Sequence, residues 1–341
     1  MIATERRAGI QAPVAVVGPD VDYVLHSKVR AASPAVSVVI TTHDHGSYIG
    51  DAISAIAAQE VDGEVEIVVC DNASDDGTQS VLRGIVDTSQ RPLTYVRLKK
   101  DIGPARGRNL GIELARGRFI AFTDADCLPR PGWLRSALAA FDSERVGVVQ
   151  GRTVPDEARV PLFEHHIAID HLDGTFATAN VIYRRQALSG LAFDPECAYW
   201  EDADLGWRLL GAGWQAAFAP DAVVAHRVIR LSPRAWMTWP AHYASLPAIV
   251  RRHPEYRRHL FLGIWVRPLH LLFDVALVGA IAALWRWEAA LLAIPYLVAF
   301  FRSRGLKGRF PPAKIVAHLA WDVVAFATLA TASVRNRALV L

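Results

Sequence analysis

The chain has 341 residues, 52% of them hydrophobic, and a formal net charge of +3 at pH 7. A chain of this length can bury a large core, either in one domain with an appendage or in two domains. The small net charge gives no indication of a nucleic-acid partner, and three cysteines without C-x-x-C spacing indicate neither a zinc site nor a disulfide framework. The amino terminus lacks a signal-peptide pattern, so we expect about the first 250 residues to stay in the cytoplasm.

From residue 36 onward, apolar runs alternate with helical patterns, which predicts a parallel, mainly three-layer α/β sheet with right-handed crossovers. Residues 1–33 receive no assignment beyond a possible edge strand at 14–17. The predicted strands lie at 36–42, 65–70, 94–98 and 118–122, and the predicted helices at 51–59, 79–86, 104–115 and 131–141.

Polar residues follow three of these strands. Asp124 and Asp126 end the run 118–122, and turn residues follow the first strand at 41–44 and the second at 71–74. In open parallel sheets ligands bind beyond the carboxyl ends of the strands, and residues i and i+2 of an extended segment point the same way. The two aspartates therefore suit one hard cation, or a sugar and a metal together. The alternative is a solvated acidic turn, which is the more common reading of an isolated D-x-D.

After residue 141 the pattern becomes less regular. We expect strands at 146–150, 179–184, 214–218 and 222–225, with an irregular segment at 152–178 that shapes the acceptor surface. That segment contains His165, His166 and His171, whose spacing matches no metal-ligand pattern, so we leave them out of the metal site. A helix at 201–211 opens with acids, which suit the positive end of its dipole. No G-x-G-x-x-G follows a strand, and no G-x-x-x-x-G-K-[ST] occurs, so a dinucleotide fold and a P-loop are not supported.

Five ordered motifs between about residues 36 and 226 resemble those of the family 2 inverting glycosyltransferases. They are the strand 37–42, the turn 71–78, the helix start 103–111, the acids at 124–126 and the helix start 201–209. Each motif is weakly specific alone, but the ordered set is specific. The resemblance implies the GT-A fold, an α/β class with a mostly parallel sheet flanked by helices, here followed by C-terminal hydrophobic helices.

The resemblance also implies a donor site for a nucleotide-sugar. It places a nucleobase at the first two strand ends, the diphosphate near the arginines of the third motif, and the ribose or sugar at the first aspartate of the D-x-D. The family often has an aromatic residue where His43 stands, so this chain departs from the pattern there. The residues assigned to donor binding are Thr41, His43, Asp71, Ser74, Arg106, Arg108 and Asp124.

By the same resemblance, Asp126 binds Mg²⁺ or Mn²⁺ and Asp202 is the catalytic base, with Glu201 the next candidate. His226 is either a further metal ligand or a core histidine. The chemistry agrees, because a cation held by carboxylates neutralises a diphosphate leaving group and one base activates the acceptor hydroxyl for direct displacement. The alternative for Glu201 and Asp202 is a structural role, in which they cap the N-terminus of the helix.

The last third of the chain is rich in apolar and basic residues. Aromatic residues at helical spacing in 233–250, followed by arginines, predict an amphipathic interfacial helix, although a helix packed on the catalytic domain is the alternative. Apolar segments follow at 269–285, 289–301 and 315–334, and only the last is long enough for a comfortable span. We therefore expect an N-terminal extension (1–33), a GT-A catalytic domain (34–230), amphipathic linker helices (231–268) and membrane-associated helices (269–341).

The resulting hypothesis is a glycosyltransferase on the cytoplasmic face of the cell membrane, acting on a glycan, saccharide or polyprenyl-linked acceptor, with membrane lipid as a further partner and no nucleic acid. A sugar-phosphate nucleotidyltransferase is a rival, but the loop 41–46 has no Lys or Arg. A non-catalytic membrane-anchored saccharide-binding or scaffold protein is the other alternative, and the intact acidic motifs argue against it.

Overall fold

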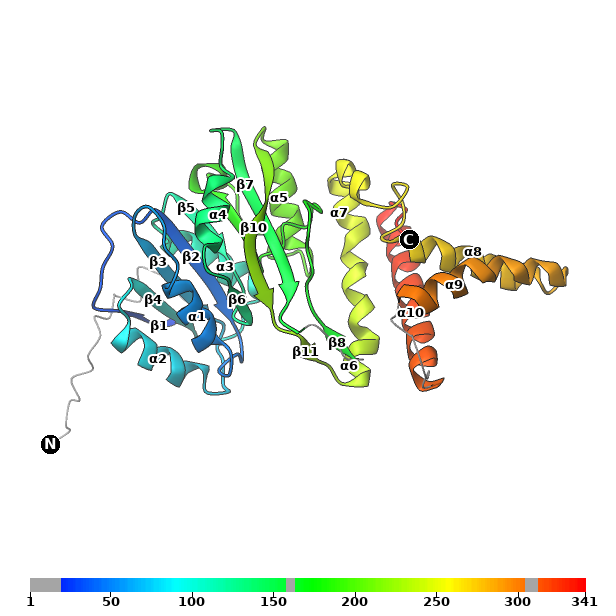
Figure 1. Ribbon diagram of the computed structural model, residues 1–341, viewed down its shortest axis with the longest axis horizontal. Coiled ribbons are helices and arrows are strands. Elements are labelled where there is room, and N and C mark those ends of the chain that lie inside the picture. Colours follow the sequence, from blue (N-terminus) through cyan, green and yellow to red (C-terminus); the bar gives the residue numbers. More distant parts are fainter. Residues whose placement is uncertain (1–19, 158–162, 304–311) are drawn as a thin grey trace. The chain divides into compact units, whose positions relative to one another are not determined.

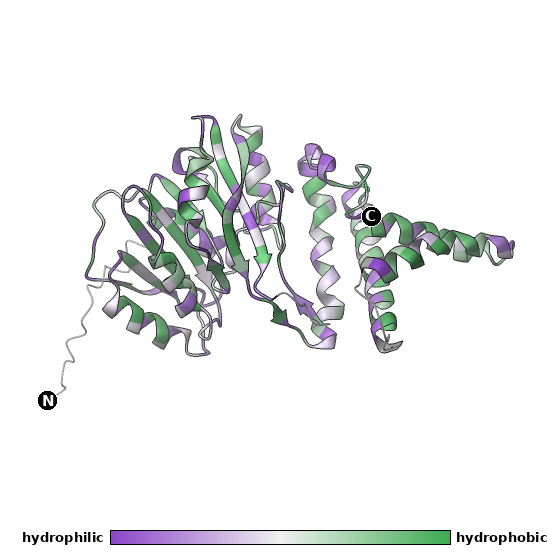
Figure 2. Ribbon diagram, viewed as in Figure 1, coloured by the Kyte–Doolittle hydropathy of each residue, from purple (hydrophilic) through white to green (hydrophobic). Residues whose placement is uncertain are grey.

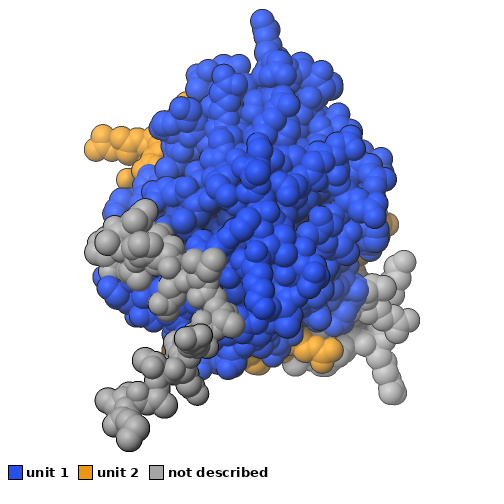
Figure 3. Space-filling view, turned by 90° about the vertical axis from the view of Figure 1, so that its left-hand side faces the viewer, with its two compact units in different colours: residues 1–159, 166–196, 201–228 blue, residues 160–165, 197–200, 229–341 orange. Residues whose placement is uncertain are grey.

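The structure, a computed structural model, describes residues 20–157, 163–303 and 312–341. The chain divides into two compact units, coloured separately in Figure 3. Unit 1 holds most of the first 228 residues, and unit 2 holds residues 229–341 with two short earlier segments, 160–165 and 197–200. The edge strand considered at 14–17 lies outside the described residues.

Among its described residues, unit 1 contains a nine-stranded mixed sheet with the strand order β1-β4-β3-β2-β5-β9-β7-β10-β6 (Figure 1). Strands β4, β3, β2 and β5 are parallel neighbours, as are β7 and β10, while β1, β9 and β6 run antiparallel to their neighbours. The strands are β1 (Val21–His26), β2 (Val36–Thr42), β3 (Val65–Asp71), β4 (Leu93–Leu98), β5 (Phe119–Phe122), β6 (Cys127–Pro129), β7 (Val146–Pro155), β9 (Val181–Arg184) and β10 (Gln215–His226).

Helices cover both faces of this sheet, because β2 is apolar on both sides. Val36, Val38 and Ile40 share one core cluster with residues of α1, α2 and α4. On the other face, α3 approaches β2 so closely that a Cβ at Gly111 would collide with Val39. The helices are α1 (Ile49–Ala57), α2 (Thr78–Thr88), α3 (Pro104–Leu114), α4 (Trp133–Ala139) and α5 (Glu201–Gly211), with a 3₁₀ turn η2 (Arg185–Leu188) after β9.

Three strands differ from the sequence expectation. Residues 21–26, which received no assignment, form β1 and pair with β4. Residues 127–129 form the short β6, which pairs with β10. The two strands expected near 214–218 and 222–225 are one strand, β10, whose register against β7 shifts between Ala219 and Val223. Single-sequence patterns miss such features because edge strands and bulges depend on a distant partner.

Unit 2 is mainly helical. Its apolar core is formed where α8 and α9 meet, around Ala276, Tyr296 and Phe300. Its helices are α6 (Pro233–Thr238), α7 (Leu246–Arg252), α8 (Pro268–Ala282), α9 (Ile294–Ser303) and α10 (Pro312–Asn336), with 3₁₀ turns η3 (Trp239–Ser245), η4 (Pro254–His259) and η5 (Trp287–Ala293). Two short strands, β8 (Glu164–His165) and β11 (Ile229–Arg230), pair antiparallel.

The segment 233–250 is not one helix. Pro240 and Pro247 each stand at the start of a new helical element, where the missing N–H costs least. Trp236, Leu246 and Val250 are buried, and α6, η3 and α7 pack against α10. The apolar side of this segment is thus covered within unit 2.

By length and composition, one described helix, Lys314–Asn336 within α10, could cross a membrane. Figure 2 shows that α8 and α9 are also strongly apolar along their length. Two acids lie inside the apolar segments and both have partners. Asp322 accepts a hydrogen bond from the Tyr296 hydroxyl (2.7 Å), and Asp274 accepts one from Trp265 Nε1 (2.8 Å).

Candidate active site

The two aspartates of the D-x-D stand directly beyond the carboxyl end of β5. Val36 to Val39 of β2 pair with Phe119 to Phe122, so this turn lies at the edge where β2 and β3 also end. Asp126 is buried and Asp124 is partly exposed. The turn continues into β6, which pairs with the end of β10 and brings His226 opposite Cys127.

Asp124, Asp126, Cys127 and His226 form one cluster of possible metal ligands. One ligand atom from each lies within 4.8 Å of the other three. The sequence reasoning missed Cys127, although its position directly after the D-x-D was a usable signal.

The donor set of this cluster fits a divalent cation. His226 Nδ1 lies 2.7 Å from the Arg227 carbonyl oxygen, so Nδ1 must carry the proton that it donates, and Nε2 keeps its lone pair. Nε2 lies 3.7 Å from Asp126 Oδ2, on the side of the carboxylates. Two carboxylates and an imidazole are ligands that Mn²⁺ and Mg²⁺ accept. Burial and the two aspartates raise the pKa of the Cys127 thiol, which makes it a poor ligand for such hard cations.

Arg108 of α3 links this cluster to the start of α5. Its guanidinium forms an ion pair with Glu201 and lies 3.9 Å from Asp124 (Arg108 Nη2 to Asp124 Oδ1). The Nε of Arg108 is buried and has no hydrogen-bond partner. One cation thus bridges two acids from different elements and retains an unused donor, an arrangement that suits an anionic ligand.

Burial, together with the charge of the neighbouring Glu201, raises the pKa of Asp202 to about 7, although Arg108 opposes the shift. Burial also raises the pKa of Asp124, with Arg108 lowering it and Asp126 raising it. A carboxyl group that titrates near neutrality can take a proton at physiological pH, which an ordinary exposed aspartate does poorly. Burial, and after it the charge of Asp202, raises the pKa of the Tyr183 hydroxyl, which has no hydrogen-bond partner.

Helix α5 is held in place from behind its acidic first turn. A Cβ at Gly206 would collide with the ring of Phe176, so the helix can approach that ring only with glycine at this position. Trp207 Nε1 donates to the Gly174 carbonyl (3.0 Å). These contacts fix the helix rotation that presents Glu201 to Arg108.

The residues assigned to the nucleobase lie at the ends of β2 and β3. Asp71 is fully buried and accepts from the Ser74 amide, the Tyr95 hydroxyl and Arg97. The Ser74 hydroxyl accepts from the Asp44 amide at 3.0 Å, which joins the loop after β2 to the turn after β3. In this structure Asp71 and Ser74 therefore order the two loops, and their contact with a base remains a prediction.

Thr41 and His43 differ in exposure. Thr41 is partly buried and would meet a Cβ placed at Gly107, while His43 is exposed and its Nδ1 lies 2.8 Å from the Asn72 carbonyl. The exposed imidazole is free to present a flat face, as a base-stacking group must.

The side chains of Arg106 and Arg108, the two arginines of the third motif, lie on different sides of α3. Positions two apart on an α-helix are separated by about 200°. Arg108 accordingly joins the acids, while Arg106 is exposed.

The three histidines of the irregular segment have separate surroundings. His165 stacks on Trp239 within unit 2, with ring centroids 4.0 Å apart, and exposed His171 pairs with Asp170 at 2.7 Å.

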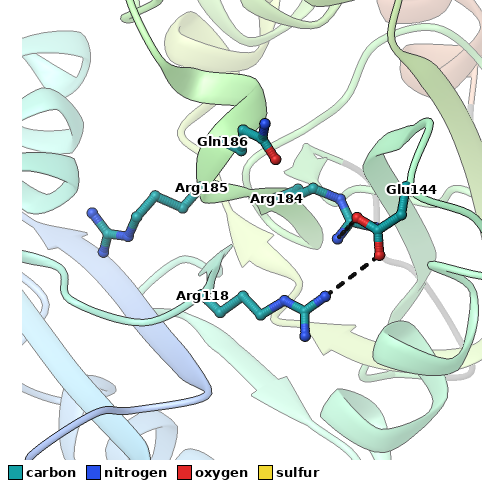
Figure 4. A pocket seen from close by; sticks show the side chains of 5 residues that line it. All are labelled: Arg118, Glu144, Arg184, Arg185 and Gln186. Atoms are coloured by element: carbon teal, nitrogen blue, oxygen red, sulfur yellow. Dashed lines mark ion pairs between the residues drawn. The ribbon is translucent and has the colours of Figure 1, made fainter.

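A second charged site lies at the opposite end of the same strands. A hollow of about 310 Å³ is lined by Arg118, Glu144, Arg184, Arg185 and Gln186 (Figure 4). Arg118 directly precedes β5, and Arg184 is paired with Phe119 across β5 and β9. Figure 4 shows Glu144 between Arg184 and Arg118, while Arg185 points away from it. None of the residues assigned from the sequence lies here.

Comparison with known families shows to which family the chain belongs. The model described as "Glycosyl transferase family 2" matches residues 37–194, and the one described as "Glycosyl transferase family group 2" matches residues 119–334, more than half of the chain. The chain belongs to glycosyl transferase family group 2. Both matches include the D-x-D at the end of β5, and the second also includes the acidic start of α5 and His226.

Curated relatives are similar over part of their length. The Pre-mycofactocin glycosyltransferase of Mycobacterium tuberculosis is 32% identical over 170 residues, covering 45% of this chain and 36% of that protein. The succinoglycan biosynthesis protein ExoO of Rhizobium meliloti is 30% identical over 210 residues, covering 55% of this chain and 59% of that protein. The chain therefore spans about one to two thirds of these relatives.

Solved structures confirm the expected fold class for this glycosyltransferase. The mannosyltransferase PcManGT from Pyrobaculum calidifontis, in complex with GDP-Man and Mn²⁺, superposes with a TM-score of 0.56 at 21% identity, covering 91% of this chain and 90% of that one. A TarS fragment from S. aureus in complex with UDP-GlcNAc gives 0.51 at 18% identity, covering 89% and 92%. At these identities the likeness concerns the fold.

Proposed function

We propose that this glycosyltransferase moves a hexose from a nucleotide-diphosphate donor to a glycan or lipid-linked acceptor by direct displacement with inversion. The observation that carries the proposal is the juxtaposition of the ligand cluster around Asp126 and His226 with the Arg108–Glu201 pair, next to Asp202 with a pKa near 7. This reaction requires a group that stabilises the negative charge of the leaving group and a group that accepts the proton of the acceptor.

In this mechanism Asp126 and His226 would hold Mg²⁺ or Mn²⁺, and the cation would supply positive charge to stabilise the leaving diphosphate. Arg108 binds the donor from the α3 side while keeping Asp124 and Glu201 in place. Asp124 orients the ribose or the sugar. Asp202 takes the proton of the acceptor hydroxyl, and burial, together with the charge of Glu201, keeps the pKa of Asp202 high enough for that task.

We infer a cell-envelope acceptor at a membrane surface. One helix of the described chain is long and apolar enough to span a bilayer, and the minor teichoic acid biosynthesis protein GgaB of Bacillus subtilis is among the similar proteins. Placement of the catalytic unit on the cytoplasmic face follows from the sequence expectation and is part of the proposal.

A nucleotide panel tests the proposal directly. The melting temperature of the protein is measured with GDP, UDP and other nucleoside diphosphates, each with Mn²⁺ or with a chelator. We expect one nucleotide to raise the melting temperature by several degrees, and only when Mn²⁺ is present, because ligands that bind the native state stabilise it by mass action. No stabilisation by any nucleotide, with no hydrolysis of nucleotide-sugars, would contradict the proposed function.

A further inference from the structure

The helices α8 and α9 form a hairpin of unit 2 whose outer half has almost no core. In the described residues from Val275 to Pro295, the buried residues are Ala276 and Gly279. A Cβ at Gly279 would come within 2.7 Å of the Ala289 carbonyl oxygen, so this glycine lets α8 and η5 approach closely. The two arms therefore meet through backbone and small side chains, and their large side chains point outward.

The outward surface of this hairpin, which we call the hairpin tip (residues 275–295), is apolar on all sides. Leu284, Trp285 and Trp287 are 80%, 77% and 74% exposed. A helix that is apolar all round is stable inside a core or a membrane and not in water. Further exposed apolar residues are Val278, Ile281, Leu291, Leu292 and Ile294.

Charge is arranged around this surface as a bilayer requires. The charged residues of the hairpin tip are Arg286 and Glu288, which pair at 3.7 Å beside the two tryptophans at the turn. Exposed Arg267 and Arg302 stand at the start of α8 and in the last turn of α9, where cations complement anionic headgroups. Further exposed cations of unit 2 lie on α7 and η4: Arg251, Arg252 and Arg258.

The length of the hairpin tip also suits insertion into one half of a bilayer. From Val275 to Trp285 the helical rise is about 15 Å, half of the hydrocarbon thickness of about 30 Å. The polar groups Asp274 and Asp322 lie below this level, hydrogen-bonded to Trp265 and Tyr296, so insertion of the tip need not bury them in lipid.

Helix α10, although long enough to cross a membrane, has a different surface. It packs against α6, η3 and α7, which carry Arg234 and Arg251. Its exposed apolar residues form one narrow stripe of small side chains: Val316, Val323, Ala327 and Val334. A crossing of α10 would carry its amphipathic neighbours into the hydrocarbon, which is costly for arginines at depth.

From these contrasts we infer that the hairpin tip, and not α10, is the element that enters the bilayer, and that the bilayer contains anionic lipid. This deepens the membrane placement proposed above and rests on it. Unit 2 then anchors the protein from one side, with α10 at the surface.

Flotation of the purified full chain with vesicles tests this inference. With phosphatidylglycerol–phosphatidylethanolamine vesicles, Leu284→Asp should weaken partition on the order of 100-fold, the cost of an acid in hydrocarbon plus the lost leucine. Val323→Asp, the matched change at a half-exposed position on α10, should leave partition unchanged within about 2-fold. Vesicles of phosphatidylcholine alone should bind the parent chain more weakly.

Additional measurements separate the possible failures. Brominated lipids should quench the fluorescence of Trp285 and Trp287, which is identified as the emission that Trp285→Phe and Trp287→Phe remove. Melting curves of the same samples with nucleotide report donor binding independently. Release by Val323→Asp, or undiminished binding of Leu284→Asp, would overturn the inference. So would a lipid-free dimer that Leu284→Asp dissociates and that does not float, because a second copy would then cover the hairpin tip.

Discussion

The two ends of the central strands of unit 1 are both rich in charge, yet they differ in how that charge is satisfied. At the amino end of β5, buried Arg184 donates to the Val146 and Ser143 carbonyls and pairs with Glu144. Its guanidinium carbon also lies 5.5 and 5.4 Å from the ring centroids of Phe119 and Phe141. Each nitrogen of the Arg184 guanidinium thus has a partner, whereas the buried Nη2 of neighbouring Arg185 has no hydrogen-bond partner.

At the carboxyl end of the same strand the charges conflict. Asp124, Glu201 and Asp202 converge on one arginine, Arg108, whose Nε has no partner, and Asp126 lies beside Asp124. Acids in excess of cations raise one another's pKa and await a cation or a proton. The paired guanidinium of Arg184 therefore indicates a structural role for that residue, and the excess of acids indicates a functional role for the carboxyl end.

The largest effect should come from the proposed base. Asp202→Asn should lower kcat by about 10²- to 10⁴-fold, the usual contribution of general-base catalysis, with the affinity for donor nucleotide nearly unchanged. Steady-state transfer assays and nucleotide titration measure the two quantities. Asp87→Asn, an exposed acid on α2, is the control. Full transfer by the Asp202 variant would move the base to Glu201.

Removing a proposed metal ligand should act on donor binding. Asp126→Ala should weaken nucleoside diphosphate binding by about 100-fold in Mn²⁺, because the cation loses a buried carboxylate. Calorimetric titration with and without EDTA checks this, and the parent and variant should differ little in EDTA. An equal loss under both conditions would indicate a folding defect instead of a metal site.

Substitutions at the amino end of β5 should change the stability of the protein and leave its activity unchanged. Arg184→Met should lower the free energy of unfolding by about 2 kcal/mol, since it removes the buried hydrogen bond to the Val146 carbonyl and the hydrogen bond to the Ser143 carbonyl. Arg118→Met, at an exposed position of the same hollow, should change it by less than about 0.5 kcal/mol. Denaturant unfolding measures both, and kcat and KM should stay within about 2-fold of the parent values. Loss of donor affinity in either variant would break the contrast between the two ends.

The pKa of Asp202 should leave a signature in stability against pH. Its pKa rises from 3.8 to about 7 on folding, so the folded state binds the extra proton. The stabilisation is complete below pH 3.8 and is lost as the pH rises through about 7. Thermal melts of the metal-free protein should show a fall of about 1–2 kcal/mol between these values, discounted for the partial exposure of the group. The fall should be absent in Asp202→Asn.

The smallest effect is expected at Tyr183. Its hydroxyl is buried without a hydrogen-bond partner, so Tyr183→Phe should be neutral or stabilising by up to about 1 kcal/mol in chemical denaturation. A destabilisation beyond that range would mean that the hydroxyl has a partner near Asp202.

Much of unit 1 could be read from local patterns. The predicted ranges for β2 and α5 agree with the structure to the residue, because one is a continuous apolar run and the other begins with acids and is followed by Gly213. β1 was missed because an edge strand has no strong pattern of its own. The single helix expected over 233–250 is interrupted at Pro240 and Pro247, residues that were visible in the sequence.

The sequence by itself determined the order of the motifs, the pair of aspartates after an apolar strand and the acidic start of α5, because each depends on neighbours in the chain. Tertiary structure alone decided that Cys127 and His226 stand opposite each other, that Arg108 and not Arg106 meets Glu201, and that Asp71 is turned inward. These relations depend on strand register and helix rotation across tens of residues, and the desolvation that raises the pKa of Asp202 exists only once the surrounding elements have packed.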